Sequence, residues 1–170
     1  PGNPVNVRYR CLDRDMDVPG EVEQPAGAFL MVSRKVWQSV GGFDESFHPV
    51  WFEDVDFCLR LRKSGHRIAY VPRVVARHVG GHSVKSTAEG RRAIFWYGNL
   101  LHYAGKHFRP AGRRAVAAAV MASAVPRMVW VTCRERSLRS LPGYGKVWTL
   151  ALRALLSASS ERADSPQAAL

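Results

Sequence analysis

Hydrophobic residues in the first half of the chain form short runs that predict strands. The longest run, Ala28 to Val32, is continuously apolar, as expected of a strand buried on both faces. Two shorter runs rich in β-branched residues, Ile68 to Val71 and Val74 to Val79, are separated by Pro72 and predict two more strands. Near the N-terminus no period is sustained, so we expect a loop with a short strand near Val5 to Tyr9.

Helical patterns lie between and beyond these runs. Arg34 to Val40 predicts a short helix that ends at a pair of glycines. Glu53 to Ser64 is the clearest helix, because acids fill its first turn, bases fill its last turn, and Gly65 follows. Three further helices are expected over Ala88 to His107, Arg113 to about Arg134, and Lys146 to Ser157. Pro110 separates the first from the second, and Pro142-Gly143 separates the second from the third.

The chain is strongly basic, and the excess charge lies in its second half. Residues 1–88 hold 12 Lys and Arg against 10 Asp and Glu, whereas residues 89–170 hold 13 against 4. A balanced first half suits a folded catalytic body, and a basic segment suits an anionic membrane surface or a nucleic acid. Residues 115–133 are long enough to span a bilayer, but Pro126 and Arg127 interrupt them. A helix lying on anionic lipid is therefore favoured over a span, and a soluble helical subdomain is an equal alternative.

Neither the cysteines nor the acidic N-terminal loop predicts a metal centre. Cys11, Cys58 and Cys133 lie far apart, so we expect free thiols in a reducing compartment. The run from Asp13 to Asp17 alternates carboxylates, which can bind a hard cation, but a solvated loop is the favoured interpretation.

A series of motifs follows in order between residues 25 and 85: Gly27-Ala28-Phe29, Gly41-Gly42-Phe43-Asp44-Glu45, Glu53-Asp54-Val55-Asp56, Arg60, Gly65, Pro72, His78, Gly81 and Ser83. Together with a looser echo at Tyr97-Gly98-Asn99 and Lys106-His107, these motifs resemble the inverting family-2 glycosyltransferases of the GT-A fold. The closest likeness is to the bacterial, rhamnosyltransferase-like branch. The resemblance implies an α/β fold, with the distal, acceptor-side part of a GT-A sheet in residues 1–88 and a basic α-helical extension in residues 89–170.

Inverting sugar transfer needs a base, because the acceptor hydroxyl loses its proton as it attacks the anomeric carbon. Asp54 lies in the first turn of an expected helix, where free backbone N–H groups and the helix dipole favour a carboxylate. The resemblance implies that Asp54 is this catalytic base. The alternative is that Glu53, Asp54 and Asp56 merely cap the helix. We expect Glu53 to orient the acceptor and Asp56 to pair with Arg60 four residues on.

The loop before this helix is expected to form the acceptor side of the site. Aromatic faces stack on the apolar surfaces of sugar rings and exclude water. Asp44 and Phe43 belong to this wall with Glu53, although core packing is the favoured role of Phe43. Trp51, next to the acidic pair, is the strongest candidate for stacking on the acceptor.

The donor side is expected in the Gly-rich loop that follows residue 79. Gly81 allows close approach to phosphate and the Ser83 hydroxyl can donate a hydrogen bond, although an ordinary turn fits equally well. Arg60 is a further expected contact to the diphosphate. A divalent cation, Mg²⁺ or Mn²⁺, would stabilise the leaving group, with His78 as a supplementary ligand or as a plain strand-end histidine. The family's main Asp-x-Asp ligands have no counterpart in this chain.

The function expected from these patterns is transfer of a sugar from a nucleotide-sugar donor to a glycan or lipid-linked acceptor. Such a transfer is a step of cell-wall or polysaccharide biosynthesis. The protein is expected in the cytoplasm, and the inner face of the plasma membrane is an alternative location. The first residue is Pro1, as expected of a fragment. Two alternatives remain open. One is a non-catalytic basic helical module that binds membrane or, less favoured, nucleic acid; the other is a remnant half-domain used in assembly.

Overall fold

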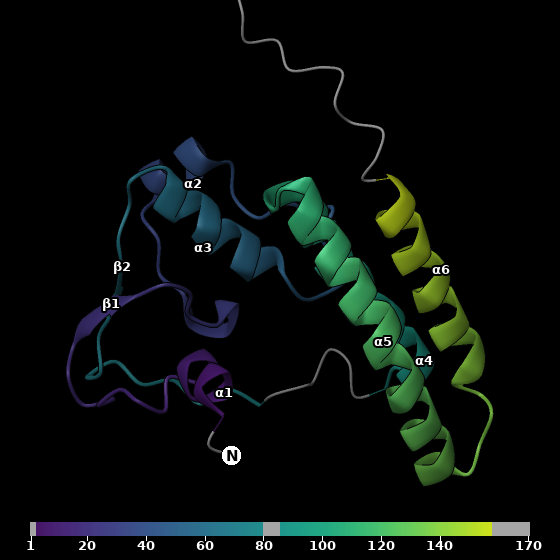
Figure 1. The fold of residues 1–170 in the computed structure, drawn as a ribbon. Coiled ribbons are helices and arrows are strands. Elements are labelled where there is room, and N and C mark those ends of the chain that lie inside the picture. The colour runs from purple at the N-terminus through teal and green to yellow at the C-terminus, as the bar shows by residue number, and fades with distance from the viewer. Residues whose placement is uncertain (1–2, 80–85, 158–170) are drawn as a thin grey trace, which may run out of the picture.

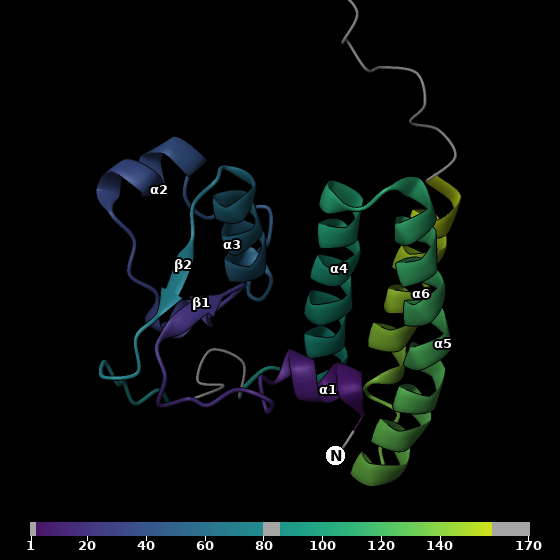
Figure 2. The same ribbon diagram turned by 60° about the vertical axis from the view of Figure 1, so that its left-hand side comes forward.

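The computed structural model describes residues 3–79 and 86–157. Residues 3–79 form the N-terminal lobe, which contains α1 (Pro4–Tyr9), β1 (Gly20–Val22), the 3-10 turn η1 (Gly27–Phe29), α2 (Arg34–Val40), α3 (Glu53–Lys63) and β2 (Ile68–Tyr70). The helical bundle follows, formed by α4 (Glu89–His107), α5 (Pro110–Glu135) and α6 (Leu141–Ser157). Figures 1 and 2 show the bundle beside the lobe, and Figure 2 shows α4 between the lobe and the other two long helices.

The sheet of the described residues consists of two short antiparallel strands. β1 pairs with β2 in the register Gly20 to Tyr70, Glu21 to Ala69 and Val22 to Ile68. The strand at Ile68 was expected from the sequence, whereas its partner falls in a segment that we expected to be loop. The described residues are thus mostly helical, and the α/β expectation is met in them only by this small sheet.

Three strand predictions are wrong for the described structure. Ala28 to Val32 forms η1 and a short extended segment instead, with Met31 92% exposed. A strand buried on both faces needs neighbouring strands, and no described strand pairs with this segment. Val74 to Val79 is likewise irregular and exposed. Val5 to Tyr9 is helical, because the Asn3 side chain caps the first turn and Pro4 stands at its first position.

The predicted helices are confirmed, with changes at their ends. α2 begins at the Ser33 cap and ends at Gly41, whose φ of 85° places it in the left-handed region that glycine adopts readily. Pro110 begins α5 and does not merely break the chain, because proline is well accommodated in the first turn. α6 likewise starts earlier than expected, at Leu141, and takes Pro142 into its first turn.

Each part of the structure has its own core. In the lobe, α3 contributes the fully buried Phe57 and Cys58, which pack with Leu61 and Ile68. In the bundle, all three helices contribute small and apolar residues, among them Ala117, Val120, Tyr144, Val147 and Ala151. α5 is also long and apolar enough to cross a membrane, and 22% of its most apolar 18-residue stretch is buried inside the protein. The expected helical extension therefore has a core of its own.

Candidate active site

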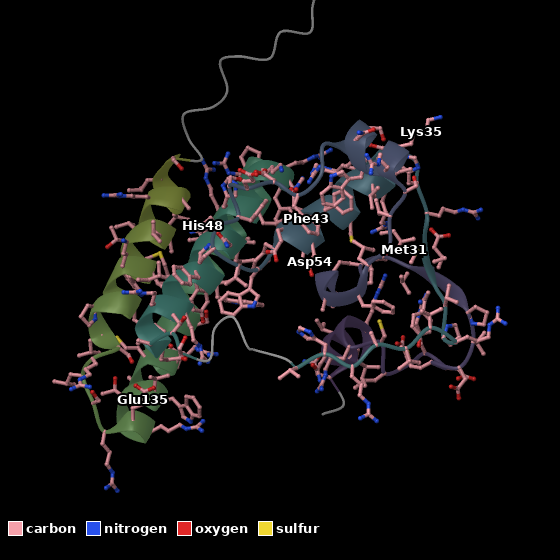
Figure 3. All side chains as sticks on the ribbon, turned by 180° about the vertical axis from the view of Figure 1, so that it is seen from behind. Met31, Lys35, Phe43, His48, Asp54 and Glu135 are labelled. Atoms are coloured by element: carbon pink, nitrogen blue, oxygen red, sulfur yellow. The ribbon has the colours of Figure 1, made fainter. Side chains whose placement is uncertain are left out.

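Asp54 lies in the first turn of α3 and projects toward η1 (Figure 3). Its Oδ2 accepts a hydrogen bond from the backbone N–H of Gly27 at 2.8 Å, and its Oδ1 accepts one from the backbone N–H of Val55 at 2.8 Å. The side chain is half-buried. Two backbone N–H donors hold both carboxylate oxygens in one orientation. Asp54 is therefore a fixed group that remains partly open to solvent.

Asn99 on α4 holds the loop that precedes α3. Its Nδ2 lies 3.3, 2.8 and 3.1 Å from the carbonyl oxygens of Phe47, Val50 and Trp51. Trp51 and Phe52 have φ angles of 73° and 75°, a region that bulky residues rarely adopt. Backbone strain of this kind persists only where the surroundings enforce it, and it clusters at functional sites. Asn99 supplies that restraint directly before the acidic pair of α3.

Asp56 joins α3 to the end of α4. The residue is fully buried, and its Oδ1 lies 2.7 Å from Nζ of Lys106 and 2.6 Å from Nε2 of His107. Its Oδ2 accepts a hydrogen bond from Nε of Arg60 at 2.7 Å. Burial would raise the pKa of Asp56, but hydrogen bonds from these three side chains outweigh it and lower that pKa. The predicted pairing of Asp56 with Arg60 is confirmed, and Asp56 proves to be the centre of a larger network.

Asp44 belongs to the same network through Lys106. Nζ of Lys106 lies 2.6 Å from Oδ2 of Asp44, while Oδ1 of Asp44 accepts hydrogen bonds from the Ser46 hydroxyl and backbone. The bond from Lys106 and those from Ser46 hold the pKa of Asp44 well below its ordinary range. Its carboxylate is thus engaged within the protein, and acceptor binding by Asp44 stays a prediction that would require it to share these bonds.

The aromatic residues near the acids pack mainly against other aromatic residues. Phe43 contacts Trp37 and Phe57 edge-on, with ring centroids 5.0 and 5.3 Å apart, but it is 37% exposed, so both its core role and its place on the acceptor wall stay predictions. Trp51 packs edge-on against Trp96 of α4 at 5.5 Å and remains half-buried. Its stacking on a sugar stays a prediction, with Trp96 as a neighbour on the same wall.

Arg60 donates three hydrogen bonds within the protein. Besides its bond to Asp56, its two terminal nitrogens donate to the carbonyl oxygens of Val40 and Gly42, both at 2.6 Å. These bonds tie the end of α2 and the following loop to α3. The expected contact of Arg60 with the donor stays a prediction, which would require the guanidinium to share these bonds.

The expected donor side is only partly described. Gly81 and Ser83 lie outside the described residues. His78 is exposed in an irregular segment, not at the end of a strand as expected. Within residues 3–79 and 86–157, no three His, Cys, Asp or Glu side chains gather in a way that could hold a metal ion. The described residues therefore hold no complete site for a divalent cation, and the expected Mg²⁺ or Mn²⁺ stays a prediction.

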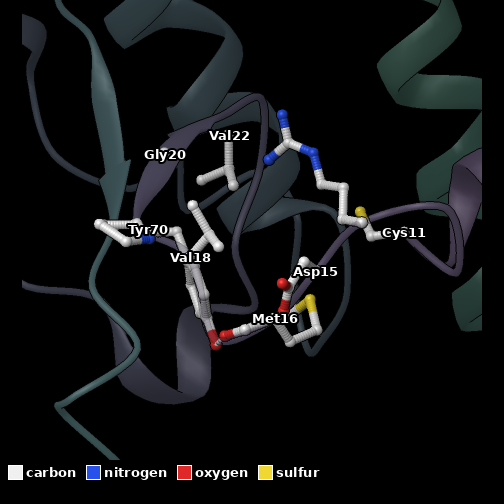
Figure 4. Close-up of a pocket in the computed structure, with 9 residues that line it drawn as sticks. Cys11, Asp15, Met16, Val18, Gly20, Val22 and Tyr70 are labelled. Atoms are coloured by element: carbon white, nitrogen blue, oxygen red, sulfur yellow. Dashed lines mark hydrogen bonds between the residues drawn. The ribbon is translucent and has the colours of Figure 1, made fainter.

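A pocket of about 320 Å³ lies beside the two-stranded sheet (Figure 4). Tyr70 lines it, and the Tyr70 hydroxyl donates a hydrogen bond to the carbonyl oxygen of Met16 at 3.0 Å. The pocket is lined by residues of the N-terminal loop and the sheet, among them Cys11, Arg14, Val18 and Val22. The residues expected to carry the transfer chemistry are not among its lining residues.

Comparison with known proteins assigns the family. A profile described as glycosyltransferase-like family 2 matches residues 15–99, half of the chain. The chain belongs to this family. The match covers Asp54 and all of the N-terminal lobe beyond the first loop, and it continues into α4 as far as Asn99. It therefore crosses the expected domain boundary after residue 88, which stays a prediction.

Several relatives of this family-2 chain are named as glycosyltransferases. The chain is 38% identical over 65 residues to rhamnosyltransferase WbbL of Escherichia coli, covering 38% of this chain and 24% of the relative. It is 32% identical over 109 residues to an N-acetylglucosaminyl-diphospho-decaprenol L-rhamnosyltransferase of Mycobacterium tuberculosis, covering 63% and 34%. A pre-mycofactocin glycosyltransferase of the same organism is 31% identical over 115 residues, covering 62% and 23%. No solved structure matches.

The expected resemblance to a rhamnosyltransferase-like family-2 glycosyltransferase is thus confirmed for part of the chain. The chain spans about a quarter to a third of the length of these curated relatives. The family implies an α/β fold of the GT-A type, of which the described residues contain the helices around Asp54 and the two-stranded sheet.

Three positioning residues of the family-2 site were not assigned a role from the sequence. Asn99, Lys106 and His107 lie on α4, more than 40 residues beyond Asp54, yet they hold the loop and the helix around it. The sequence did contain a signal, because these residues make up the looser echo of the family motifs. Their roles depend on which side chains meet in space, so the sequence alone could not assign them.

Proposed function

We propose that this chain forms the acceptor side of an inverting glycosyltransferase, with Asp54 as the catalytic base. The observation that carries the proposal is the state of that carboxylate. It is held by two backbone N–H donors at the start of a helix, it is half-buried, and it lies next to a strained aromatic loop. A base with one fixed orientation and partial access to solvent is suited to deprotonating a sugar hydroxyl.

In the proposed reaction the acceptor hydroxyl gives its proton to Asp54 as its oxygen attacks the anomeric carbon. The new C–O bond forms on the face opposite the breaking bond, and the nucleoside diphosphate leaves with the bonding electrons. Inversion at the anomeric carbon follows from this in-line geometry. The donor is a nucleotide-activated sugar, and the names of the relatives favour rhamnose.

Glu53 is the proposed acceptor-orienting residue. Its Oε2 is buried and has no hydrogen-bond partner within the described part of the chain. A buried carboxylate oxygen without a donor is costly, and an acceptor hydroxyl is the kind of group that would satisfy it. Trp51 and Trp96, which meet edge-on at 5.5 Å, would flank the sugar ring.

The acceptor is proposed to be a glycan or a lipid-linked sugar, since one relative is named for a diphospho-decaprenol acceptor. We place the reaction in the cytoplasm, at the inner face of the plasma membrane. The expected Mg²⁺ or Mn²⁺ would need ligands other than the described residues, so no step is derived through it.

Replacement of Asp54 by Asn tests the proposal. In the intact protein, Asp54→Asn should lower kcat for sugar transfer by about 10² to 10⁴-fold, because the amide cannot accept the hydroxyl proton. Donor affinity, measured by calorimetry, should stay within about twofold, since Asp54 acts on the acceptor. Glu45→Gln removes an exposed acid from the same region and is the matched control. Undiminished turnover in Asp54→Asn would remove it from the mechanism, and wild-type protein without transfer would favour the remnant alternative.

A further inference from the structure

One side of α5 is uncharged, apolar and exposed. We define the outer face of α5 as nine residues at helical spacing, all exposed: Ala115, Ala118, Ala119, Ala122, Val125, Pro126, Val129, Trp130 and Cys133. The opposite side of the helix carries its buried residues, Ala117, Val120, Ala124 and Val131. The outer face is about 27 Å long at 1.5 Å per residue. No other described helix covers it.

The adjoining edge of α6 extends this surface. Nε1 of Trp148 donates to the carbonyl oxygen of Met121 at 3.2 Å, which places the indole at the seam between the two helices. Trp148 is 42% exposed and Leu152, one turn further on, is 40% exposed. An apolar surface that continues across two helices is larger than the scattered apolar residues expected on an ordinary protein surface.

Positive charge surrounds this apolar surface without entering it. Residues 86–157 hold twelve Lys and Arg against two Glu. Arginines stand at both ends of the outer face, at positions 113 and 114 and at positions 134, 136 and 139. Arg127, the cation in the middle of α5, is directed toward α4, where its Nη2 lies 3.3 Å from Oε1 of Glu89. Arg134 lies over the Trp130 ring, 5.0 Å from its centroid.

We propose that the outer face of α5, with Trp148 and Leu152, binds the surface of an anionic lipid bilayer. An apolar face that enters the boundary between headgroups and acyl chains, with cations and tryptophans at its margin, is the pattern of an interfacial helix. Anionic headgroups meet the arginines at both ends, and the acyl region receives the uncharged stripe between them. The proposal does not depend on the proposed transfer reaction.

Charge and packing select this occupant over three others. A second copy of the chain would bring two strongly basic bundles together, and their repulsion opposes the contact. Nucleic acid binds through cations, and the outer face has none. A spanning helix would have to place Arg127 and its partner Glu89 near the bilayer centre, which is costly. Peripheral binding leaves that ion pair and the contacts of α5 with its two neighbours intact.

Labelling of a native cysteine tests the proposal without introducing a charged residue into the outer face. In Cys11→Ser protein, an environment-sensitive thiol dye should attach to Cys133 on the outer face. Cys58 should stay unlabelled, because it is fully buried and burial raises the pKa of its thiol to about 11. The matched control, Cys133→Ser, carries the dye on Cys11 in the N-terminal lobe. Phosphatidylcholine vesicles containing phosphatidylglycerol should shift the Cys133 signal to the blue and leave the Cys11 signal unchanged.

A charge introduced into the face provides the second arm. Val129→Asp in the intact protein should lower the fraction of protein that sediments with phosphatidylglycerol vesicles by about tenfold or more. Its circular dichroism spectrum should be unchanged. Val75→Asp, the same change at an exposed position in the lobe, should bind like wild type. High salt should weaken wild-type binding. Equal dye responses at both cysteines, resistance to carbonate extraction as for a spanning helix, or salt-independent binding to pure phosphatidylcholine would each overturn the proposal. Self-association of the wild-type protein in solution that is abolished by Val129→Asp would also overturn the proposal.

Discussion

The backbone N–H of Gly27 donates to Oδ2 of Asp54 at 2.8 Å, although 27 residues separate them in the chain. The contact requires glycine at position 27. A Cβ atom added there would lie 2.9 Å from Cβ of Asp54 and 3.3 Å from its Oδ2, closer than side-chain carbons normally approach. Gly27, the first glycine of the family motifs, is thus fitted to the residue proposed as the base.

Gly27→Ala should therefore displace Asp54 and slow sugar transfer by the intact protein by about tenfold to a hundredfold, since displacements of about 1 Å can cost that much. The readout is kcat at saturating donor and acceptor. Gly20→Ala is the control, because a Cβ at position 20 meets nothing within 4 Å. If both variants keep wild-type kcat, the fit between Gly27 and Asp54 has no bearing on catalysis.

The second prediction concerns the buried carboxylate of Asp56. Asp56→Asn should lower the free energy of unfolding by about 3 kcal/mol or more, because it leaves buried cationic partners without their counter-charge. Asp44→Asn removes an acid that shares Lys106 but is 29% exposed, and it should cost about 1 kcal/mol or less. Urea unfolding followed by circular dichroism gives both values. Equal losses in the two variants would contradict the central role of Asp56.

Acid should destabilise the protein through these two carboxylates. Hydrogen bonds lower the pKa of both Asp44 and Asp56 from their ordinary value of 3.8. A lowered pKa in the folded state contributes stability that is fully present above 3.8 and is lost as the pH falls below that value. The free energy of unfolding should thus be level from about pH 5 to neutrality and fall below about pH 4. In Asp44→Asn the fall should be shallower, and an unchanged slope would show that Asp44 gains no proton affinity on unfolding.

The helices were predictable from the sequence because their signals are local. Ser33 caps the start of α2 and Gly41 caps its end. In α3 the acidic first turn and the basic last turn agree with the helix dipole. These features depend on residues within a few positions of one another, so one sequence suffices to find them. The position of Asp54 in the first turn of α3 followed from the same signals.

The strands were poorly predicted because pairing is not local. Ala28 to Val32 is as apolar as a buried strand, but no described strand lies beside it, and the carboxylate of Asp54 takes the N–H of Gly27. Conversely, Gly20 to Val22 has no strand pattern of its own and becomes one by pairing with Ile68 to Tyr70. Hydrophobic pattern predicts whether a segment suits a sheet, not whether a partner is present.

The same limit applies to the site. The Asp56–Arg60 pair was predictable from spacing within one helix, whereas the contacts of Asn99 and Lys106 depend on the packing of α4 against the lobe. The role of Asp54 as the base came from the family resemblance and stays a prediction. Arg60 shows the same limit, because the family motif suggested only a donor contact, which stays a prediction. The bonds of its guanidinium to the carbonyl oxygens of Val40, at the end of α2, and Gly42 depend on packing and were not predictable from the sequence.

A close contact between two helices of the bundle gives the last prediction. A Cβ added to Gly143 of α6 would lie 2.5 Å from Cα and O of Gly90 in α4, so Gly143→Ala must push the helices apart. Thermal or urea unfolding should show a loss of about 1 to 3 kcal/mol, the usual cost of overpacking. Gly145→Ala, two residues further along α6, meets nothing within 4 Å and should instead stabilise the protein by about 0.5 to 1 kcal/mol, because alanine favours a helix interior. Opposite changes in the free energy of unfolding for these two glycine-to-alanine substitutions would separate the effect of helix propensity from that of packing. Stabilisation by Gly143→Ala would show that α4 and α6 do not pack this closely.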